Sequence, residues 1–215
     1  MSGLRARWRQ KARQAIQECA LDLFDERGFG AVTIEEIAAA AEVSPSSVYR
    51  YFGTKEGILV ADEFDEMSQE RIADILDPGD PVGSLLQAVL TYESAPFSGT
   101  GEANGNATET SGPWRRVRYF FAEPSVRMAA LAELDRASQR LIPLIDADGE
   151  MSETQARVIA NALTFGYFAA LEQWYLDGGS RPIASYVEDG MKPLRKIWSS
   201  PPGEDADRYS EFQEG

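Results

Sequence analysis

Between residues 33 and 52 the sequence TIEEIAAAAEVSPSSVYRYF encodes two short helices with almost no chain between them. Thr33 followed by Glu36 has the spacing of a capping box, which opens the first helix. Ser44 is a favourable N-cap, and the proline after it suits the first position of the second helix. Only Glu42 and Val43 remain between the two helices. This arrangement predicts a helix-turn-helix.

The rest of the chain has the apolar periodicity of α-helices, and no alternating pattern indicates a strand. Thr54 is expected to cap a fourth helix directly after Gly53. Helical periodicity covers residues 10–27, 34–41, 45–51, 55–76, 82–92, 114–122, 125–145, 152–176 and 183–198. We therefore predict an all-α protein.

Its predicted parts are a three-helix helix-turn-helix domain at 1–54, a larger helical ligand-binding and dimerisation domain at 55–200, and a flexible acidic tail at 201–215. Residues 94–113 are rich in Gly, Ser, Thr and Asn, and we expect a mobile loop there, either a lid or an insertion.

The chain contains no histidine, which excludes Ser-His-Asp catalysis and every His-ligated metal site. Cys19 is its one cysteine, so no internal disulfide can form. The sequence has no run of 18 apolar residues and no apolar segment behind its basic N-terminus, so we expect neither a membrane span nor a secretory signal. We expect a cytoplasmic protein with no cofactor, no metal site and no catalytic residues.

Charge is distributed unevenly along the chain. The net charge is -14, yet residues 1–55 hold eight Lys and Arg against seven Asp and Glu, while residues 56–215 hold thirteen against twenty-eight. Five of the early cations lie within the first thirteen residues. A polyanion can therefore be met only by the N-terminal end of the molecule.

The second helix of a helix-turn-helix lies in the major groove of DNA, and its N-terminal residues meet base edges. In this chain Pro45, Ser46 and Ser47 occupy that end. The hydroxyl, phenol and cationic groups that follow suit phosphate or base contacts. They belong to Tyr49, Arg50, Tyr51 and Lys55. The alternative is that Tyr49 and Phe52 pack against the first helix while the hydroxyls serve only as caps.

Residues 15–59, AIQECALDLFDERGFGAVTIEEIAAAAEVSPSSVYRYFGTKEGIL, resemble the DNA-binding domain of the TetR family of transcriptional regulators. The resemblance implies a homodimer on a palindromic DNA operator, released when the C-terminal domain binds a small molecule. It implies phosphate contacts by Thr33, Ser47, Tyr49, Tyr51 and Lys55, and base contacts by Pro45, Ser46 and Arg50. Family members often carry Gly at position 42, where a left-handed Glu would cost ~1 kcal/mol.

The remainder of the chain has no comparable motif. Candidate effector contacts are the aromatic and basic residues Trp114, Arg118, Phe121, Phe165, Phe168 and Trp174, with packing in a core or dimer interface as the alternative. For dimerisation we expect apolar faces on 152–176 and 183–198, with burial of these faces within the monomer as the alternative. The faces comprise Ile159, Leu163, Gly166, Tyr167, Ala170, Leu171 and Trp174 on the first helix and Met191, Leu194 and Trp198 on the second. A fourth helix over 55–76 would couple the effector site to DNA.

The alternative functions are an activator with the same DNA contacts and a helical small-molecule-binding protein with altered DNA binding.

Overall fold

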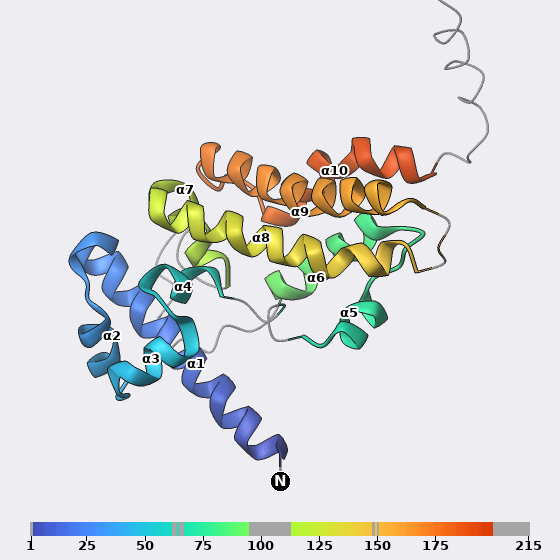
Figure 1. The fold of residues 1–215 in the computed structure, drawn as a ribbon. Coiled ribbons are helices and arrows are strands. Elements are labelled where there is room, and N and C mark those ends of the chain that lie inside the picture. The colour runs from blue at the N-terminus through green and yellow to red at the C-terminus, as the bar shows by residue number, and fades with distance from the viewer. Residues whose placement is uncertain are drawn as a thin grey trace, which may run out of the picture.

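The computed structural model describes residues 2–61, 64, 67–94, 113–147, 149 and 151–199. The predicted tail and residues 95–112 of the predicted loop lie outside these ranges. The described elements run in the order α1 (Ser2–Arg27), η1 (Phe29–Ala31), α2 (Ile34–Ala40), α3 (Pro45–Phe52), α4 (Lys55–Val60), α5 (Gln69–Ile75), α6 (Pro81–Ser94), η3 (Pro113–Arg116), α7 (Val117–Ala122), α8 (Pro124–Ile145), α9 (Glu153–Leu176) and α10 (Ile183–Ser199) (Figure 1). Every one of them is helical, which confirms the predicted all-α class.

Three predicted caps hold the helix-turn-helix in place. Thr33 Oγ1 accepts from the backbone N–H of Glu36 at 3.2 Å, and the Glu36 carboxylate accepts from the N–H of Thr33 at 2.8 Å. Ser44 Oγ accepts from the N–H of Ser47 at 3.2 Å. Thr54 Oγ1 accepts from the N–H of Gly57 at 3.0 Å. These bonds satisfy N–H groups that the first turn of a helix otherwise leaves without partners, so the helix starts are encoded locally.

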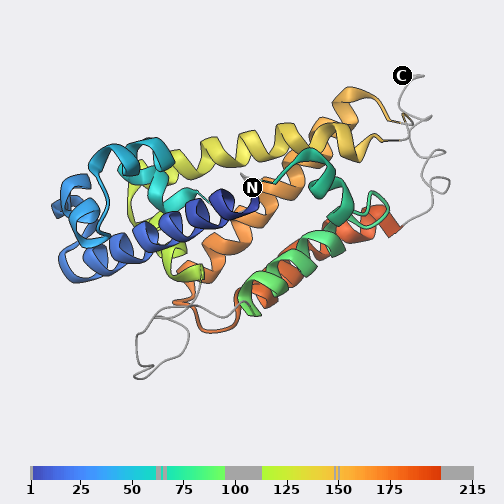
Figure 2. The same cartoon turned by 90° about the horizontal axis from the view of Figure 1, so that it is seen from below.

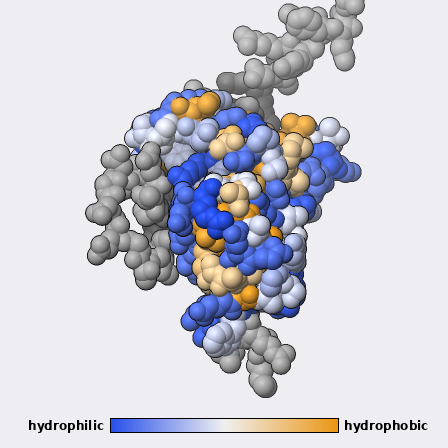
Figure 3. All heavy atoms as spheres, turned by 90° about the vertical axis from the view of Figure 1, so that its left-hand side faces the viewer, coloured by the Kyte–Doolittle hydropathy of each residue, from blue (hydrophilic) through white to orange (hydrophobic). Residues whose placement is uncertain are grey.

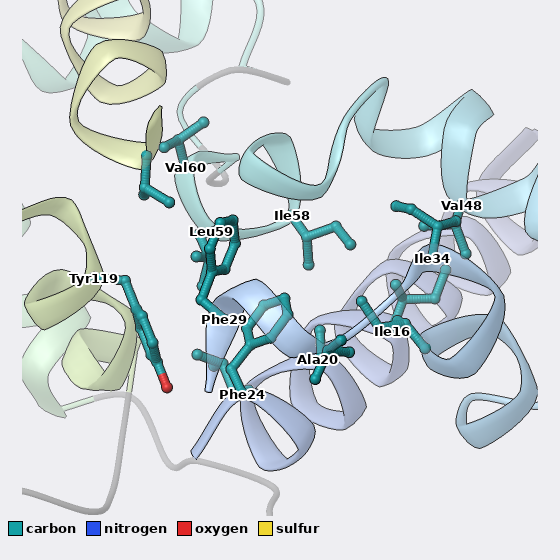
Figure 4. Packing of buried hydrophobic residues seen from close by; sticks show 14 of the residues in the cluster. Ile16, Ala20, Phe24, Phe29, Ile34, Val48, Ile58, Leu59, Val60 and Tyr119 are labelled. Carbon is teal, nitrogen blue, oxygen red and sulfur yellow. The ribbon is translucent and has the colours of Figure 1, made fainter. Parts of the chain in front are cut away.

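One hydrophobic core, here called the N-terminal core, joins the first four helices. Its centre consists of side chains with 0–1% exposure: Ile16, Ala20, Phe24, Ile37, Ala38, Val48, Ile58 and Leu59 of the first four helices and Val126 of α8. Tyr119 of α7 and Phe168 of α9 belong to the same cluster. Figure 4 shows the ring of Tyr119 directed from α7 towards Phe24 of α1. The packing around α1 to α4 is therefore continuous with the rest of the molecule.

A second core lies among the longer helices. It contains Val82 and Val89 of α6, Ile145 of α8, Leu171 of α9 and Val187 of α10. Figure 2 shows α6 alongside α10. Helices α9 and α10 approach each other closely at Gly166, since a Cβ placed there would lie 3.1 Å from the sulfur of Met191.

The predicted fourth helix over 55–76 was too long. α4 ends at Val60, Ala61 is extended, and a separate helix α5 begins after Ser68, whose hydroxyl accepts from the N–H of Arg71 at 3.4 Å. The chain between these helices carries four acidic residues, at positions 62, 63, 65 and 66. Negative charge beyond the C-terminus of a helix opposes the helix dipole, which disfavours continuing α4.

Candidate nucleic-acid interface

The helix α3 turns a polar face to solvent. Pro45, Ser46, Tyr49 and Arg50 are exposed, and the side chain of Tyr49 keeps 50% of its surface accessible. On the opposite face Val48 has no exposed surface and fixes α3 to the N-terminal core. The face towards α1 to α3 is hydrophilic with small separate apolar areas (Figure 3). The exposed groups of α3 are therefore held rigidly from behind and can be reached by a macromolecule.

A cluster of hydroxyl groups marks the start of α3. The Oγ atom of Ser44 lies 2.9 Å from the hydroxyl oxygens of both Ser46 and Ser47. Arg50 donates to Ser47 Oγ at 3.3 Å, and its guanidinium lies 4.9 Å from the centre of the Tyr51 ring. Backbone N–H groups at a helix N-terminus favour a phosphate oxygen. The predicted contacts Pro45, Ser46, Ser47 and Arg50 therefore share one small area.

Lys55 ties the start of α4 to the region before α2. Its ammonium donates to the carbonyl oxygens of Phe29 at 2.7 Å and Val32 at 3.0 Å, and it lies 4.3 Å from the centre of the Phe29 ring. An ammonium has three N–H donors, so this bracing is compatible with the predicted phosphate contact. The sequence predicts a phosphate contact for Lys55 but gives no sign of these two hydrogen bonds, which join it to residues 26 and 23 positions earlier in the chain.

Tyr51 faces a different neighbourhood from Tyr49. Its ring is half-buried, makes an edge contact with Phe52 at 6.4 Å between centroids, and lines a cavity beside α8. Thr33 is exposed, and its hydroxyl bonds to Glu36 in the capping box. The phosphate contacts of Thr33 and Tyr51 stay predictions.

The turn between α2 and α3 is closed by two backbone bonds. The N–H of Val43 donates to the carbonyl of Ala38 at 2.9 Å, and that of Glu42 donates to Ala39 at 3.2 Å. This is the Schellman arrangement, in which the residue after the C-cap adopts a left-handed conformation. Glu42 does so with φ of 54°, which confirms the conformation considered from the sequence.

Comparisons with known proteins agree with this arrangement. Residues 16–61, which hold the helix-turn-helix and its caps, match the family described as bacterial regulatory proteins, tetR family. These residues are therefore a TetR-type DNA-binding domain. The chain is similar to the HTH-type transcriptional regulator HbdR of Aromatoleum sp. (strain CIB), with 28% identity over 188 residues, 85% of this chain and 78% of that protein.

Two solved TetR-family structures share the fold. NalD of Pseudomonas aeruginosa, a secondary repressor of the MexAB-OprM multidrug efflux pump, superposes with a TM-score of 0.52 at 21% identity over 87% of this chain and 96% of its own. Thermus thermophilus FadR, solved in complex with lauroyl-CoA, gives a TM-score of 0.51 at 21% identity over 90% and 98%. The domain match and the similarity to HbdR show a DNA-binding transcriptional regulator, and the two solved structures show the same fold.

A polar cluster, here called the α1–α7 joint, links the DNA-binding helices to the rest of the molecule. It consists of Asp22 and Asp25 on α1 with Arg115, Arg118 and Tyr119. Arg115 donates to Asp25 at 2.5 Å and to Asp22 at 2.7 Å, and Asp25 also accepts from Arg118 and from the Tyr119 hydroxyl. Burial of the ring, together with the bond to Asp25, raises the pKa of Tyr119 to about 12. The phenol therefore stays a neutral donor.

The chain after α4 is held by bonds to its backbone. The carbonyl of Ala61 accepts from Gln17 of α1 at 2.9 Å and from Arg116. Arg140 of α8 donates to the carbonyl of Phe64 at 2.7 Å and to that of Met67. Side chains from α1, η3 and α8 thus all hydrogen-bond to the backbone of the link between α4 and α5.

The six predicted effector contacts do not form one site. Phe121 and Phe168 meet with 4.9 Å between ring centroids, and Arg127 lies 5.4 and 5.6 Å from these two rings. Arg118 is engaged in the α1–α7 joint. Trp174 is buried beside Gly179, and Phe165 is 37% exposed on α9. The side chain of Trp114 lies outside the described residues. An effector role for these residues stays a prediction.

A cavity of 270 Å³ lies between the helix-turn-helix and α8. Its lining comes from α1, α3, α4, the residue after α4, and α8: Arg13, Tyr51, Phe52, Gly57, Ala61, Glu133, Arg136, Ala137 and Arg140. None of the six predicted effector residues is among them. No local pattern in the sequence indicates this cavity, since its walls come from segments up to 127 positions apart, from Arg13 to Arg140.

The described part of the chain contains no group of three or more Cys, Asp or Glu side chains suited to a metal ion. Among the same residues, no helix is both long and apolar enough to cross a bilayer.

Proposed function

We propose that this protein is a TetR-family repressor that binds a palindromic operator as a homodimer and leaves it when a small molecule binds. The observation that carries the proposal is the outward face of α3. Ser46, Tyr49 and Arg50 are exposed there, while Val48 anchors the helix from behind. Pro45, Ser46 and Arg50 are the proposed base contacts, and the flanking hydroxyls and Lys55 the proposed phosphate contacts. Since the partner is chromosomal DNA, the proposed place of action is the cytoplasm.

The proposed dimer interface differs from the faces expected from the sequence. Of the residues expected there, Leu163, Ala170, Leu171, Trp174 and Met191 are buried within the single chain, whereas Ile159, Gly166, Tyr167 and Leu194 are partly buried. A different stripe on α9 remains at the surface, with members three, four or seven residues apart. It comprises Val158, Ala162, Phe165, Ala169 and Leu176, of which Val158 and Leu176 are 63% and 68% exposed. Such spacing suits helix packing across a two-fold axis.

The proposed effector is a small, mainly apolar molecule, because the aromatic residues of α7 and α9 outnumber the charged groups near them. Effector binding would be transmitted to the DNA-binding helices through the α1–α7 joint and through the hydrogen-bonded link after α4. Both connect the DNA-binding helices to the elements that would surround an effector. To move the operator from nearly full to nearly empty, the effector must favour the released state by ~5.5 kcal/mol.

An activator would use the same DNA contacts and differ only in where its operator lies relative to the promoter. A ligand-binding protein without DNA affinity would instead show no selection of DNA sequences.

The test is selection of genomic fragments by the purified protein at moderate salt, followed by sequencing of the retained DNA. We expect an inverted repeat with half-sites about 34 Å apart, one turn of the double helix. Arg50→Ala should change the preferred sequence, and Ser199→Ala on α10 serves as a matched control. A folded, dimeric protein that enriches no sequence, with or without extraction of bound small molecules, would contradict the proposal.

A further inference from the structure

The first turns of α1 extend past the helix-turn-helix. Residues 7–11 are all exposed, and the indole of Trp8 is 68% accessible. The first fully buried side chain of α1 is Ile16, which is also where the match to the TetR family begins. In Figure 1 these turns project below the body, on the side where α3 lies. This end of α1 therefore contributes little to the fold.

The same turns are the most basic part of the chain. Residues 1–17 contain five Lys and Arg and no Asp or Glu, although the whole protein has a net charge of -14. Within the described part of the chain, Arg7, Arg9 and Lys11 make no ion pair.

Charge makes these turns a poor helix on their own. Arg7 and Lys11 are four residues apart, as are Arg5 and Arg9, and like charges at that spacing repel along a helix face. Cations near a helix N-terminus also oppose the helix dipole. A polyanion alongside would reverse the first effect and offset the second. The sequence is therefore suited to a helix that is stabilised by bound phosphates.

The direction of this helix is fixed by packing further along. The Arg13 guanidinium lies 5.1 Å from the centre of the Phe52 ring, at the end of α3, and Ile16 and Ala20 are buried in the N-terminal core. At 1.5 Å per residue, the turns before Arg13 reach roughly 17 Å beyond this anchor. They can follow several phosphates of a duplex whose major groove holds α3.

We propose that the N-terminal turns of α1 bind the phosphate backbone of the DNA that flanks each half-site, through Arg7, Arg9 and Lys11. This inference rests on the proposed operator binding and adds a second contact to it. DNA is preferred over an acidic surface of the protein itself, because α3 already brings a duplex to this side of the molecule. The contact reads no sequence, so it adds affinity that depends on salt and on duplex length.

The test compares two duplexes that carry the selected operator, one ending at the half-sites and one longer by a helical turn, ~10 base pairs, on each side. The variant is Arg7→Gln with Arg9→Gln and Lys11→Gln. A matched control removes three cations elsewhere, with Arg157→Gln, Arg181→Gln and Lys192→Gln. Dissociation constants are measured over a range of salt concentrations for the full-length proteins.

For the wild type and the control, we expect the longer duplex to bind more tightly and with a steeper salt dependence. In the variant, the slope of log K against log salt on the longer duplex should fall by ~0.9 for each phosphate that the protein no longer neutralises. On the short duplex the variant and the wild type should bind alike.

Equal slopes for variant and wild type on the longer duplex would overturn the inference while leaving operator binding intact. So would a variant whose dimerisation, measured without DNA, changes more than that of the control, since the basic turns would then contact protein. If no protein binds either duplex specifically, it is the proposed function that fails.

Discussion

Glu42 is the residue at which this chain departs most clearly from what its backbone favours. Its φ of 54° is left-handed, whereas the other left-handed positions among the described residues are glycines. A side chain with a Cβ atom is disfavoured there by roughly 1–2 kcal/mol. The turn persists because Val43 and the buried Ala38 hold it from the core side.

Glu42→Gly is expected to stabilise the protein by about 1 kcal/mol, because glycine adopts this conformation without strain, although it also gains freedom in the unfolded chain. Equilibrium unfolding in urea measures the change. Glu42→Ala is the matched control, since it removes the carboxylate and keeps the strain. If both variants gained the same stability, charge rather than conformation would be responsible.

Glu36 makes the stabilisation by the capping box depend on pH. Its carboxylate accepts from the backbone and hydroxyl of Thr33 and from Arg27 at 2.7 Å. The backbone bond from Thr33, followed by the bond from Arg27, lowers the pKa of Glu36 from 4.5 to about 2. Since the folded pKa lies below the unfolded value, the stabilisation is complete above pH 4.5 and is lost as the pH falls towards 2.

Unfolding followed from neutral pH down to about pH 3 should therefore show a loss of stability that is smaller in Glu36→Gln. The glutamine keeps the shape and can still accept the Thr33 bond, but it carries no charge. The same acid-induced loss in both proteins would show that the capping carboxylate is not its source.

At the scale of elements, helix starts could be predicted and contacts between distant helices could not. Thr33, Ser44 and Thr54 cap their helices through bonds that span three residues, so the sequence carries the signal. The break after Val60 was missed because apolar periodicity continues across it. The α1–α7 joint joins residues 90 or more positions apart, and no local pattern announces such a pairing.

Asp25 is the centre of that joint, and its side chain is only 20% exposed. Asp25→Asn should destabilise the protein by about 2 kcal/mol, because Arg115 and Arg118 lose a charged acceptor in a poorly hydrated site. Asp22→Asn is the matched control: its side chain is 71% exposed and it makes one contact with Arg115, so less than about 1 kcal/mol is expected. Urea unfolding tests both, and equal losses would refute the central role of Asp25.

At the scale of the whole molecule, the sequence does not reveal which apolar helix faces are buried within the monomer and which stay at its surface. Periodicity identified α9 and α10 as apolar helices, yet it could not say which apolar face the same chain would bury. Packing against α8 and α10 buries the side chains of Leu163, Leu171 and Trp174 of α9. What is left outward is the stripe from Val158 to Leu176, which becomes visible only once the monomer core is complete.

Phe165→Glu places a charge near the middle of this stripe, and the proposed two-fold contact would bury two such charges per dimer. We expect the dimer dissociation constant to rise by ~100-fold, about 2.7 kcal/mol, as measured by analytical ultracentrifugation. Affinity for the complete inverted repeat should then fall towards that for a single half-site, since two linked α3 helices no longer bind together.

Ile75→Glu is the matched control, because Ile75 is a similarly exposed apolar residue, 47% accessible, on α5. It should leave both the dimer and the operator affinity close to those of the wild type. If Phe165→Glu remained dimeric, the stripe on α9 would not be the contact, and the pairing of the two recognition helices would have to come from another face.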